Sequence, residues 1–185
     1  MDDIVLQAMA KWPNVPDCFG WLGLDSRGQW HMRDDRVQLI GAFQSGQDGA
    51  KGTVLRHEKL IEFIHRNYDV DGQGRWFFQN GPQRVYVELE ATPWVWRLND
   101  RFEPTSHTGQ SSQVMACLVD ETGHVYLHTA AGLGLVHTWD VALVAEAIEQ
   151  GIWTPEVCLA CELPERFGFV LSPQRAQDSQ HSSQA

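Results

Sequence analysis

The sequence lacks an excess of positive charge, a long apolar run and a basic N-terminal segment. Its 185 residues include 14 lysines and arginines against 24 aspartates and glutamates, so the formal net charge is −10. Because such a surface repels phosphate backbones, we expect no nucleic-acid partner. No apolar run approaches the ~20 residues that cross a bilayer, and residues 1–4 are acidic where a secretory signal would be basic. We therefore expect a soluble, cytoplasmic protein with no membrane partner.

Cysteine is scarce as well, with four residues in the whole chain: Cys18, Cys117, Cys158 and Cys161. Since nothing indicates export to an oxidising compartment, free thiols are expected rather than disulfides. The spacing of Cys158 and Cys161 is that of redox and zinc sites. However, the apolar run 156–163 around them predicts a strand, on which residues three apart point to opposite faces. The sequence therefore predicts no metal site and no cofactor.

The motifs of the common enzyme classes are absent or incomplete. The chain has no nucleophile elbow, no phosphate-binding loop and no dinucleotide-binding fingerprint. The segment 57–61 starts like a metalloprotease helix, yet Ile61 stands where the second histidine ligand is required. Residues 69–74 start like a calcium loop, but Asn80 replaces the bidentate glutamate, so a hairpin turn is favoured. We assign no catalytic residue.

A repeated turn is the most informative feature of the sequence. The pattern Asp-x-x-Gly occurs between apolar segments at residues 25–28, 71–74 and 120–123, and a degenerate copy occurs at 165–168. The leading acids are separated by 45 to 49 residues. Such a turn joins two antiparallel strands, because aspartate accepts hydrogen bonds from the turn backbone and glycine adopts the positive φ that reverses the chain. The regular spacing predicts duplicated β-hairpin units.

Two segments have apolar stripes at helical spacing, and each lies between two of the repeated turns. They cover residues 55–67 and 138–151. The predicted fold class is therefore α+β, with two related halves, each made of antiparallel β-hairpins packed on one amphipathic helix. The expected organisation is an N-terminal helix at 1–12, a first half at 13–98, a linker at 99–112, a second half at 113–174 and a disordered tail at 175–185.

Four elements of the first half resemble an uncharacterised proteobacterial family of unknown function. They are the Arg-Gly-Gln-Trp hairpin at 27–30, the helix start at 55–61, the second hairpin at 71–78 and the Glu-Ala-Thr-Pro-Trp segment at 90–94. The similarity extends over about residues 19–98. The resemblance implies a two-domain α+β fold with repeated motifs, and a role in signalling or ligand binding.

Tryptophan is unusually common, with eight residues, and its large ring serves cores, interfaces and ligand sites alike. Two tryptophans hold equivalent places in successive hairpins, and two more lie on one face of a nearby predicted strand. An arginine and a histidine open the central helix, where backbone N–H groups and the helix dipole favour anions. The predicted ligand-binding residues are Arg56, His57, Trp30, Trp76, Trp94 and Trp96.

These observations predict a non-enzymatic regulatory or ligand-binding protein. Its partner would be a small anionic or aromatic molecule, or a second protein, held by the tryptophan-rich hairpins. Two alternatives stay open. One is an enzyme with an acid–base pair formed by His57 with Glu62 or Asp34. The other is a scaffold that forms a homodimer through exposed strand edges.

Overall fold

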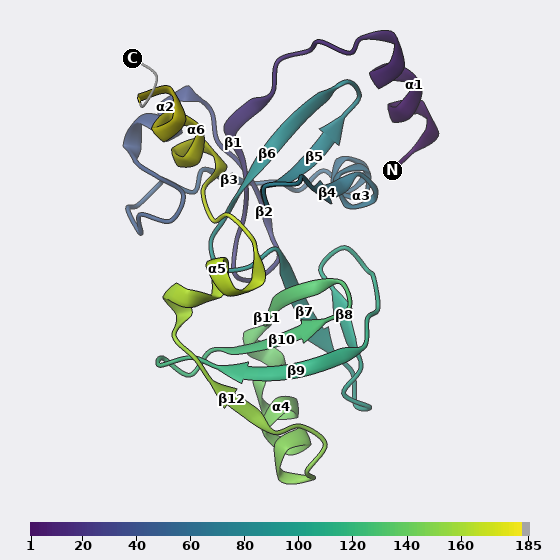
Figure 1. The fold of residues 1–185 in the computed structure, drawn as a ribbon, viewed down its shortest axis with the longest axis vertical. Helices are drawn as coiled ribbons and strands as arrows, with labels where there is room; N and C mark the ends of the chain where they lie inside the picture. Colours follow the sequence, from purple (N-terminus) through teal and green to yellow (C-terminus); the bar gives the residue numbers. More distant parts are fainter. Residues whose placement is uncertain (183–185) are drawn as a thin grey trace. The chain divides into compact units, whose positions relative to one another are not determined.

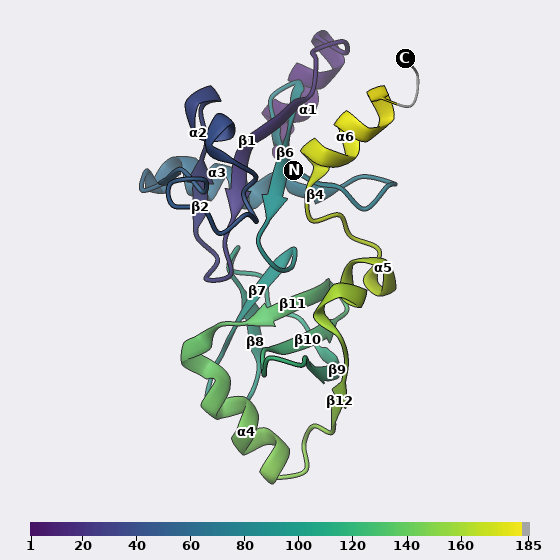
Figure 2. The ribbon, with the colours of Figure 1, turned by 90° about the vertical axis from the view of Figure 1, so that its left-hand side faces the viewer.

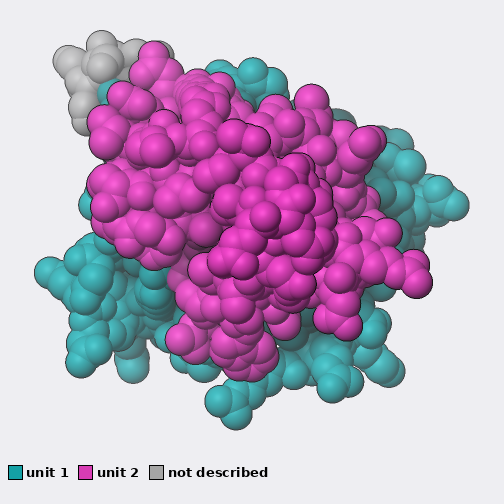
Figure 3. Space-filling view, turned by 90° about the horizontal axis from the view of Figure 1, so that it is seen from below, with its two compact units in different colours: residues 1–25, 29–90, 169–185 teal, residues 26–28, 91–168 magenta. Residues whose placement is uncertain are grey.

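The computed structural model describes residues 1–182, which divide into two compact units, each built around a sheet of six strands (Figure 1). Unit 1 contains residues 1–25, 29–90 and the segment from Phe169 onward, and unit 2 contains residues 26–28 and 91–168; Figure 3 colours them separately. These units differ from the expected halves, because residues 94–98 pair within the sheet of unit 2 and the chain returns to unit 1 at Phe169. The fold class is α+β, as predicted.

The sheet of unit 1 is mixed, with one parallel pair at its centre. Its strands are β1 (Cys18–Leu24), β2 (Trp30–Met32), β3 (Thr53–Val54), β4 (Tyr68–Val70), β5 (Trp76–Asn80) and β6 (Gln83–Leu89), in the order β3-β2-β1-β6-β5-β4. Strands β1 and β6 run parallel, and the other neighbours are antiparallel. Tyr86, Val87 and Leu89 of β6 are fully buried, so the core of this unit centres on that strand.

Four helices belong to unit 1: α1 (Asp3–Lys11), α2 (Asp35–Ile40), α3 (Glu58–Arg66) and α6 (Pro173–Ser182). Helix α3 forms inside the predicted segment, because Leu60 and Ile64 stand one turn apart on its apolar stripe. Helix α6 corrects the prediction of a disordered tail. The buried carboxylate of Glu88 accepts a hydrogen bond from Gln174 N at 3.0 Å, which ties the first turn of α6 to β6. Residues 183–185 of the predicted tail lie outside the described residues.

The sheet of unit 2 is also mixed and has two parallel pairs, β7 with β11 and β9 with β12. Its strands are β7 (Trp94–Leu98), β8 (Pro104–Ser106), β9 (Val114–Val119), β10 (Val125–Thr129), β11 (Gly132–Val136) and β12 (Pro155–Val157), in the order β12-β9-β10-β11-β7-β8. Helix α4 (Val141–Glu149) lies beside this sheet and buries Val144 and Ala147 (Figure 2). The remaining helices are η1 (Thr138–Asp140), η2 (Ala160–Glu162) and α5 (Leu163–Phe167). Among the described residues, no helix has the length and apolar composition needed to cross a membrane.

The two units follow one chain path, which confirms the prediction of two related halves. In each unit a hairpin, β1–β2 or β7–β8, is followed by a three-stranded meander, β4–β5–β6 or β9–β10–β11. The last strand of the meander then pairs in parallel with the first strand of the hairpin. The repeated turns 71–74 and 120–123 join the first two strands of each meander. These two turns therefore occupy equivalent positions.

The fourth copy of the turn lies at 99–102, between β7 and β8, and not at 165–168. Asn99 replaces the aspartate, and its Oδ1 accepts hydrogen bonds from the backbone N–H groups of Arg101 and Glu103 at 3.0 Å each. Phe102 replaces the glycine and has a φ of 61°, although it is not a glycine. The segment 99–112 is thus more than a linker, because it contains this turn and strand β8.

At 165–168 the expected hairpin is replaced by the end of helix α5. Gly168 follows the last helical residue with a left-handed conformation, φ 65° and ψ 42°, and its N–H group bonds back to the helix. A glycine in this conformation is the usual way for a helix to end. The degenerate repeat copy is therefore a helix terminus, which resembles the turn in sequence because both features require glycine at positive φ.

The strand predicted over residues 156–163 is also wrong beyond its first residues. Only β12 is extended, and the chain then turns into η2 and α5, since Pro164 suits the first turn of a helix. Cys158 is buried, with its Sγ 3.6 Å from Val119 O, whereas Cys161 is exposed. All four cysteines are free thiols.

Candidate functional site

The sheet of unit 1 has an apolar face and a polar face. Side chains alternate along β6, so Val85 and Val87 point to one face while Tyr86 and Glu88 point to the other. Helix α3 packs beside β5, and helix α6 packs against β6 and β1. Both faces belong to a sheet whose central strands, β1 and β6, are hydrogen-bonded to a neighbouring strand on each side.

A cavity of about 230 Å³ lies on the apolar face, between α3 and the strands. Its apolar walls include Trp21, Leu22, Met32, Leu60, Ile64 and Phe78. Leu22 and Ile64 are buried, whereas Trp21 is 39% and Met32 is 47% exposed, so these two larger side chains form the outer part of the wall. A concave apolar surface that leaves large apolar side chains in contact with water is typical of a ligand site.

The cavity also has two polar groups, the amide of Asn80 and the thiol of Cys18. Burial raises the pKa of Cys18, because the thiolate is less well solvated than the thiol. The thiol is therefore protonated at neutral pH and behaves as part of the apolar wall rather than as a nucleophile. The amide of Asn80 is left as the group that could orient a ligand by hydrogen bonding.

The predicted basic pair, Arg56 and His57, lies at the start of α3 and directly follows a residue that lines this cavity. Leu55 lines the cavity, and Arg56 and His57 follow it directly and are exposed. His57 is the N-cap residue, and its Nδ1 accepts a hydrogen bond from Leu60 N at 3.3 Å. The helix start is thus partly capped by its own chain, and Arg56 supplies the positive charge that is available to an anion.

The predicted tryptophans of unit 1, Trp30 and Trp76, are interior residues that come together through Tyr68. Trp30 is 2% exposed, and its Nε1 donates to His65 Nε2 of α3 at 3.0 Å. The ring centroid of Tyr68 lies 5.2 Å from that of Trp30 and 4.8 Å from that of Trp76. Burial lowers the pKa of His65 and raises the pKa of Tyr68, so both are neutral at pH 7. These rings form an aromatic core behind α3.

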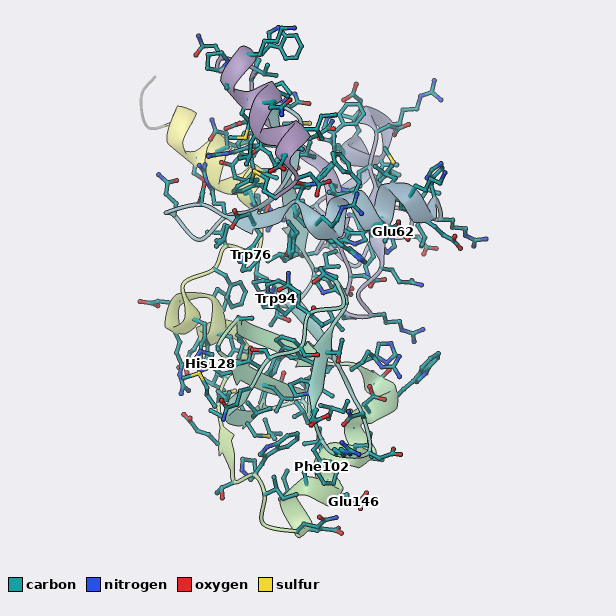
Figure 4. All side chains as sticks on the ribbon, turned by 90° about the vertical axis from the view of Figure 1, so that its right-hand side faces the viewer. Glu62, Trp76, Trp94, Phe102, His128 and Glu146 are labelled. Carbon is teal, nitrogen blue, oxygen red and sulfur yellow. The ribbon has the colours of Figure 1, made fainter. Side chains whose placement is uncertain are left out.

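The other two predicted tryptophans, Trp94 and Trp96, lie on β7 in unit 2. Their rings stack with centroids 6.0 Å apart. Trp94 Nε1 donates to Ala131 O at 2.8 Å, and Trp96 Nε1 donates to Leu127 O at 3.2 Å. Figure 4 labels Trp76 and Trp94, one from each unit. The six predicted residues are thus divided between the two units, and the tryptophan that lines the cavity at α3 is Trp21.

Sequence reasoning missed a buried polar cluster on the other face of the same sheet. Arg33 is 1% exposed and donates to three backbone carbonyls, those of Ala50 at 2.8 Å, Gly20 at 3.2 Å and Gly41 at 2.6 Å. Burial lowers the pKa of Arg33, and the carboxylate of Glu88 opposes that change. Two of the accepting carbonyls belong to the glycine-rich stretch 41–52, so Arg33 fixes this loop over the sheet.

The same polar face contains a histidine–carboxylate pair. His31 Nε2 lies 3.0 Å from Asp25 Oδ2, and both side chains are buried. Strand β2, which carries His31 and is followed by Arg33, has three residues, too few for alternation to be detected in the sequence. The glycine-rich stretch 41–52 was the available signal, because the carbonyls of such a loop that are shielded from water need a donor within the protein. Within the described residues, no group of three or more His, Cys, Asp or Glu side chains is placed to hold a metal ion.

Comparison with known proteins places the chain in a family without an assigned function. The model of the family DUF2944, described as "Protein of unknown function (DUF2946)", matches residues 1–174. The chain belongs to this family. The DUF2944 match includes both units and thus extends beyond the first half, on which the resemblance in the sequence rested. No curated protein matches the sequence significantly.

Two solved structures of DUF1285 family proteins are similar to this DUF2944 member. The protein from Silicibacter pomeroyi DSS-3 has a TM-score of 0.48 and 13% sequence identity, covering 79% of this chain and 84% of that chain. The protein from Shewanella baltica OS155 has a TM-score of 0.44 and 14% identity, covering 68% of this chain and 91% of that chain. Both are described by their family alone.

Proposed function

We propose that this protein is a ligand-binding protein with a regulatory role, and that the cavity between α3 and the sheet of unit 1 is its binding site. The observation that supports this proposal is the set of residues that forms the walls of the cavity. Its walls are mainly apolar and come from both the helix and the sheet, while its polar groups are an amide and a neutral thiol. Mostly apolar walls with few polar groups are the pattern of sites that bind small organic molecules.

The ligand class follows from the size of the cavity and from the charge beside it. A volume of about 230 Å³ admits a compact aromatic or aliphatic body. The exposed indole of Trp21 offers an aromatic surface at the outer wall. Because the chain has a net charge of −10, capture of an anion depends on a local cation, and Arg56 beside Leu55 is placed to provide it. The proposed ligand is therefore a small aromatic or aliphatic molecule with one anionic group.

Blocking the cavity is the direct test, with 2-naphthoate as the probe and isothermal titration calorimetry as the measurement. Leu55→Trp adds a large ring at the cavity wall and should weaken binding by about tenfold or more, because overpacked sites exclude their ligand. Leu39→Trp is the matched control: Leu39 is 88% exposed on α2 and does not line the cavity. Equal binding by the two variants, or no binding to the unmodified protein near about 1 mM probe, would contradict the proposal.

A second comparison tests the anionic group. Arg56→Gln should weaken binding of 2-naphthoate several-fold, since an exposed charge contributes about 1 kcal/mol or less. The same variant should bind neutral 2-naphthamide as the unmodified protein does. If Arg56→Gln weakens both probes equally, the arginine stabilises the helix start and does not recognise the anion.

A further inference from the structure

The side-chain amide of Asn80 is a polar group of the cavity at α3 that is open to a ligand. Asn80 is the last residue of β5 and is exposed, whereas the four residues before it on this strand are buried. Because side chains alternate along a strand, Asn80 shares its face with Phe78, and both residues line the cavity. Within the part of the chain that the structure describes, the Asn80 amide makes no hydrogen bond. It is therefore available both to donate to a bound molecule and to accept from it.

The neighbouring amide, that of Gln83, is directed away from Asn80. Gln83 is the direct partner of Asn80 across the β5–β6 ladder, so the two side chains share one face of the sheet. However, Gln83 Nε2 donates to Pro16 O at 2.9 Å. This bond holds the Gln83 amide against the segment that precedes β1, and Gln83 does not line the cavity. The amide of Asn80 is thus left to water or to a ligand.

The register of the sheet places Asn80 far from the β2 side of the cavity. Leu22 of β1 pairs with Met32 of β2 and with Val87 of β6, and both Leu22 and Met32 line the cavity. Asn80 pairs with Gln83, which precedes Val87 by four residues on β6. Four residues of a strand extend about 13 Å, and β5 lies three strands from β2, or about 14 Å. Asn80 and Met32 therefore stand at diagonally opposite corners of the cavity wall, about 19 Å apart between Cα atoms.

The cation proposed to hold an anionic group belongs to the β2 corner. Leu55 N donates to Trp30 O of β2 at 2.7 Å, so the segment that carries Arg56 starts beside β2. The wall between the two corners is apolar, apart from the thiol of Cys18, whose pKa is raised by burial. The cavity thus has a positive charge beside one corner and the Asn80 amide at the other, with an apolar stretch between them.

We propose that Asn80 determines the specificity of this cavity, and that the ligand is an elongated hydroxyaryl carboxylate with its two polar groups at opposite ends of one aromatic body. This inference rests on the function proposed for the cavity and defines its ligand more closely. The hydroxyl group exchanges a hydrogen bond with the amide of Asn80, the aromatic body contacts the apolar wall, and the carboxylate lies toward Arg56. An elongated molecule is required because the amide and the cation belong to opposite corners.

Two probes of equal shape test the hydrogen bond, 6-hydroxy-2-naphthoate and 6-methyl-2-naphthoate, each titrated calorimetrically into the unmodified protein and into Asn80→Leu. The ratio of the two dissociation constants is compared between the proteins, which cancels the difference in hydration of the probes. Asn80→Leu should shift this ratio against the hydroxyl probe by about threefold to tenfold. Gln7→Leu replaces an exposed amide on α1 that does not line the cavity, and this matched control should leave the ratio unchanged. An equal ratio in Asn80→Leu and in the unmodified protein would overturn the proposal.

Alkylation of Cys18 by iodoacetamide, followed by mass spectrometry, shows separately whether the probes occupy the cavity. At a probe concentration about four times the dissociation constant, Cys18 should react about fivefold more slowly. Cys161, the exposed thiol of unit 2, is the internal control and should react at the same rate with and without probe. If both probes protect Cys18 while Asn80→Leu leaves their ratio unchanged, this inference fails and the function proposed for the cavity stands. If neither probe binds or protects Cys18 near about 1 mM, both proposals fail.

Discussion

Units 1 and 2 use the same turn in the same place but stabilise its aspartate differently. Asp71 in unit 1 pairs with Arg75 at 2.8 Å and accepts a hydrogen bond from Tyr86 Oη at 3.0 Å. Asp120 in unit 2 accepts a hydrogen bond from Tyr126 Oη at 2.8 Å. In both turns Oδ1 accepts from the turn backbone, and Oδ2 is the oxygen that meets the tyrosine. The backbone role therefore requires one side-chain oxygen that accepts hydrogen bonds at this position, and the second oxygen is free to acquire different partners.

The difference in partners predicts a difference in stability, and Asp120→Asn should have the largest effect. Burial raises the pKa of Asp120, but hydrogen bonds from Thr122, His124 and Tyr126 outweigh it and hold the pKa well below its ordinary value. Asparagine keeps a turn acceptor but loses the charge and one acceptor for Tyr126. The free energy of unfolding at pH 7 should fall by about 2 kcal/mol, measured by urea denaturation.

The pH dependence of this loss shows whether the charge of Asp120 is its source. Because the pKa of Asp120 is lower in the folded state, its contribution is complete above the ordinary aspartate pKa of about 3.9. That contribution is lost as the pH falls through the lower pKa of the folded state. The difference between Asp120→Asn and the unmodified protein should therefore shrink as the pH is lowered below about 4. A difference that is constant with pH would show that the charge is not the source of the stability.

Asp71→Asn is the matched change in unit 1 and should have a smaller effect, about 1 kcal/mol. Its side chain is 9% exposed, against 1% for Asp120, so water can replace more of the lost hydrogen bonding. Hydrogen bonds also lower the pKa of Asp71, in opposition to burial. Equal losses in the two variants would mean that the two turns are equivalent in energy as well as in position.

Glycine in the turn offers a second comparison, between Gly123→Ala and Gly72→Ala. Gly123 has a φ of +87° and open space where the Cβ atom of alanine would lie, so the cost of alanine is that of the left-handed backbone alone, about 1–2 kcal/mol. Gly72, in the equivalent turn of unit 1, also has open space but no positive φ. Gly72→Ala should therefore leave the melting temperature nearly unchanged or raise it slightly. If both variants lose stability, the cause would be contacts of the added methyl group with neighbouring residues rather than strain in the left-handed backbone.

The parts of the fold that were predictable from the sequence are those with a local signal. Helices α3 and α4 lie inside the predicted segments 55–67 and 138–151, because an apolar stripe is a property of neighbouring residues. The turns at 71–74 and 120–123 were visible for the same reason. The turn at 99–102 was not, because Asn99 and Phe102 perform the roles of aspartate and glycine with different residue types.

The candidate sites depend on strand order, which the sequence does not display. The cavity at α3 gathers residues from positions 18 to 85, and they meet because β1 pairs in parallel with β6. Trp21 lines the cavity and Trp30 is buried in the core, yet both contribute equally to the tryptophan content of the sequence. The number of tryptophans therefore does not distinguish a residue of a cavity wall from a residue of the core.

Phe102, labelled in Figure 4, allows the smallest and cleanest test of how the two units differ. It holds a left-handed conformation without being glycine, and its ring contacts Trp153 of the same unit edge to face, with centroids 6.1 Å apart. Phe102→Ala removes the ring and keeps the backbone strain, whereas Phe102→Gly removes both. The glycine variant should therefore be more stable than the alanine variant by about 1 kcal/mol in urea denaturation, the ordinary cost of a left-handed alanine. If the alanine variant is the more stable of the two, the chain entropy of glycine outweighs the backbone strain at position 102. The turn at 99–102 then does not share the requirement for glycine that the other copies of the turn have.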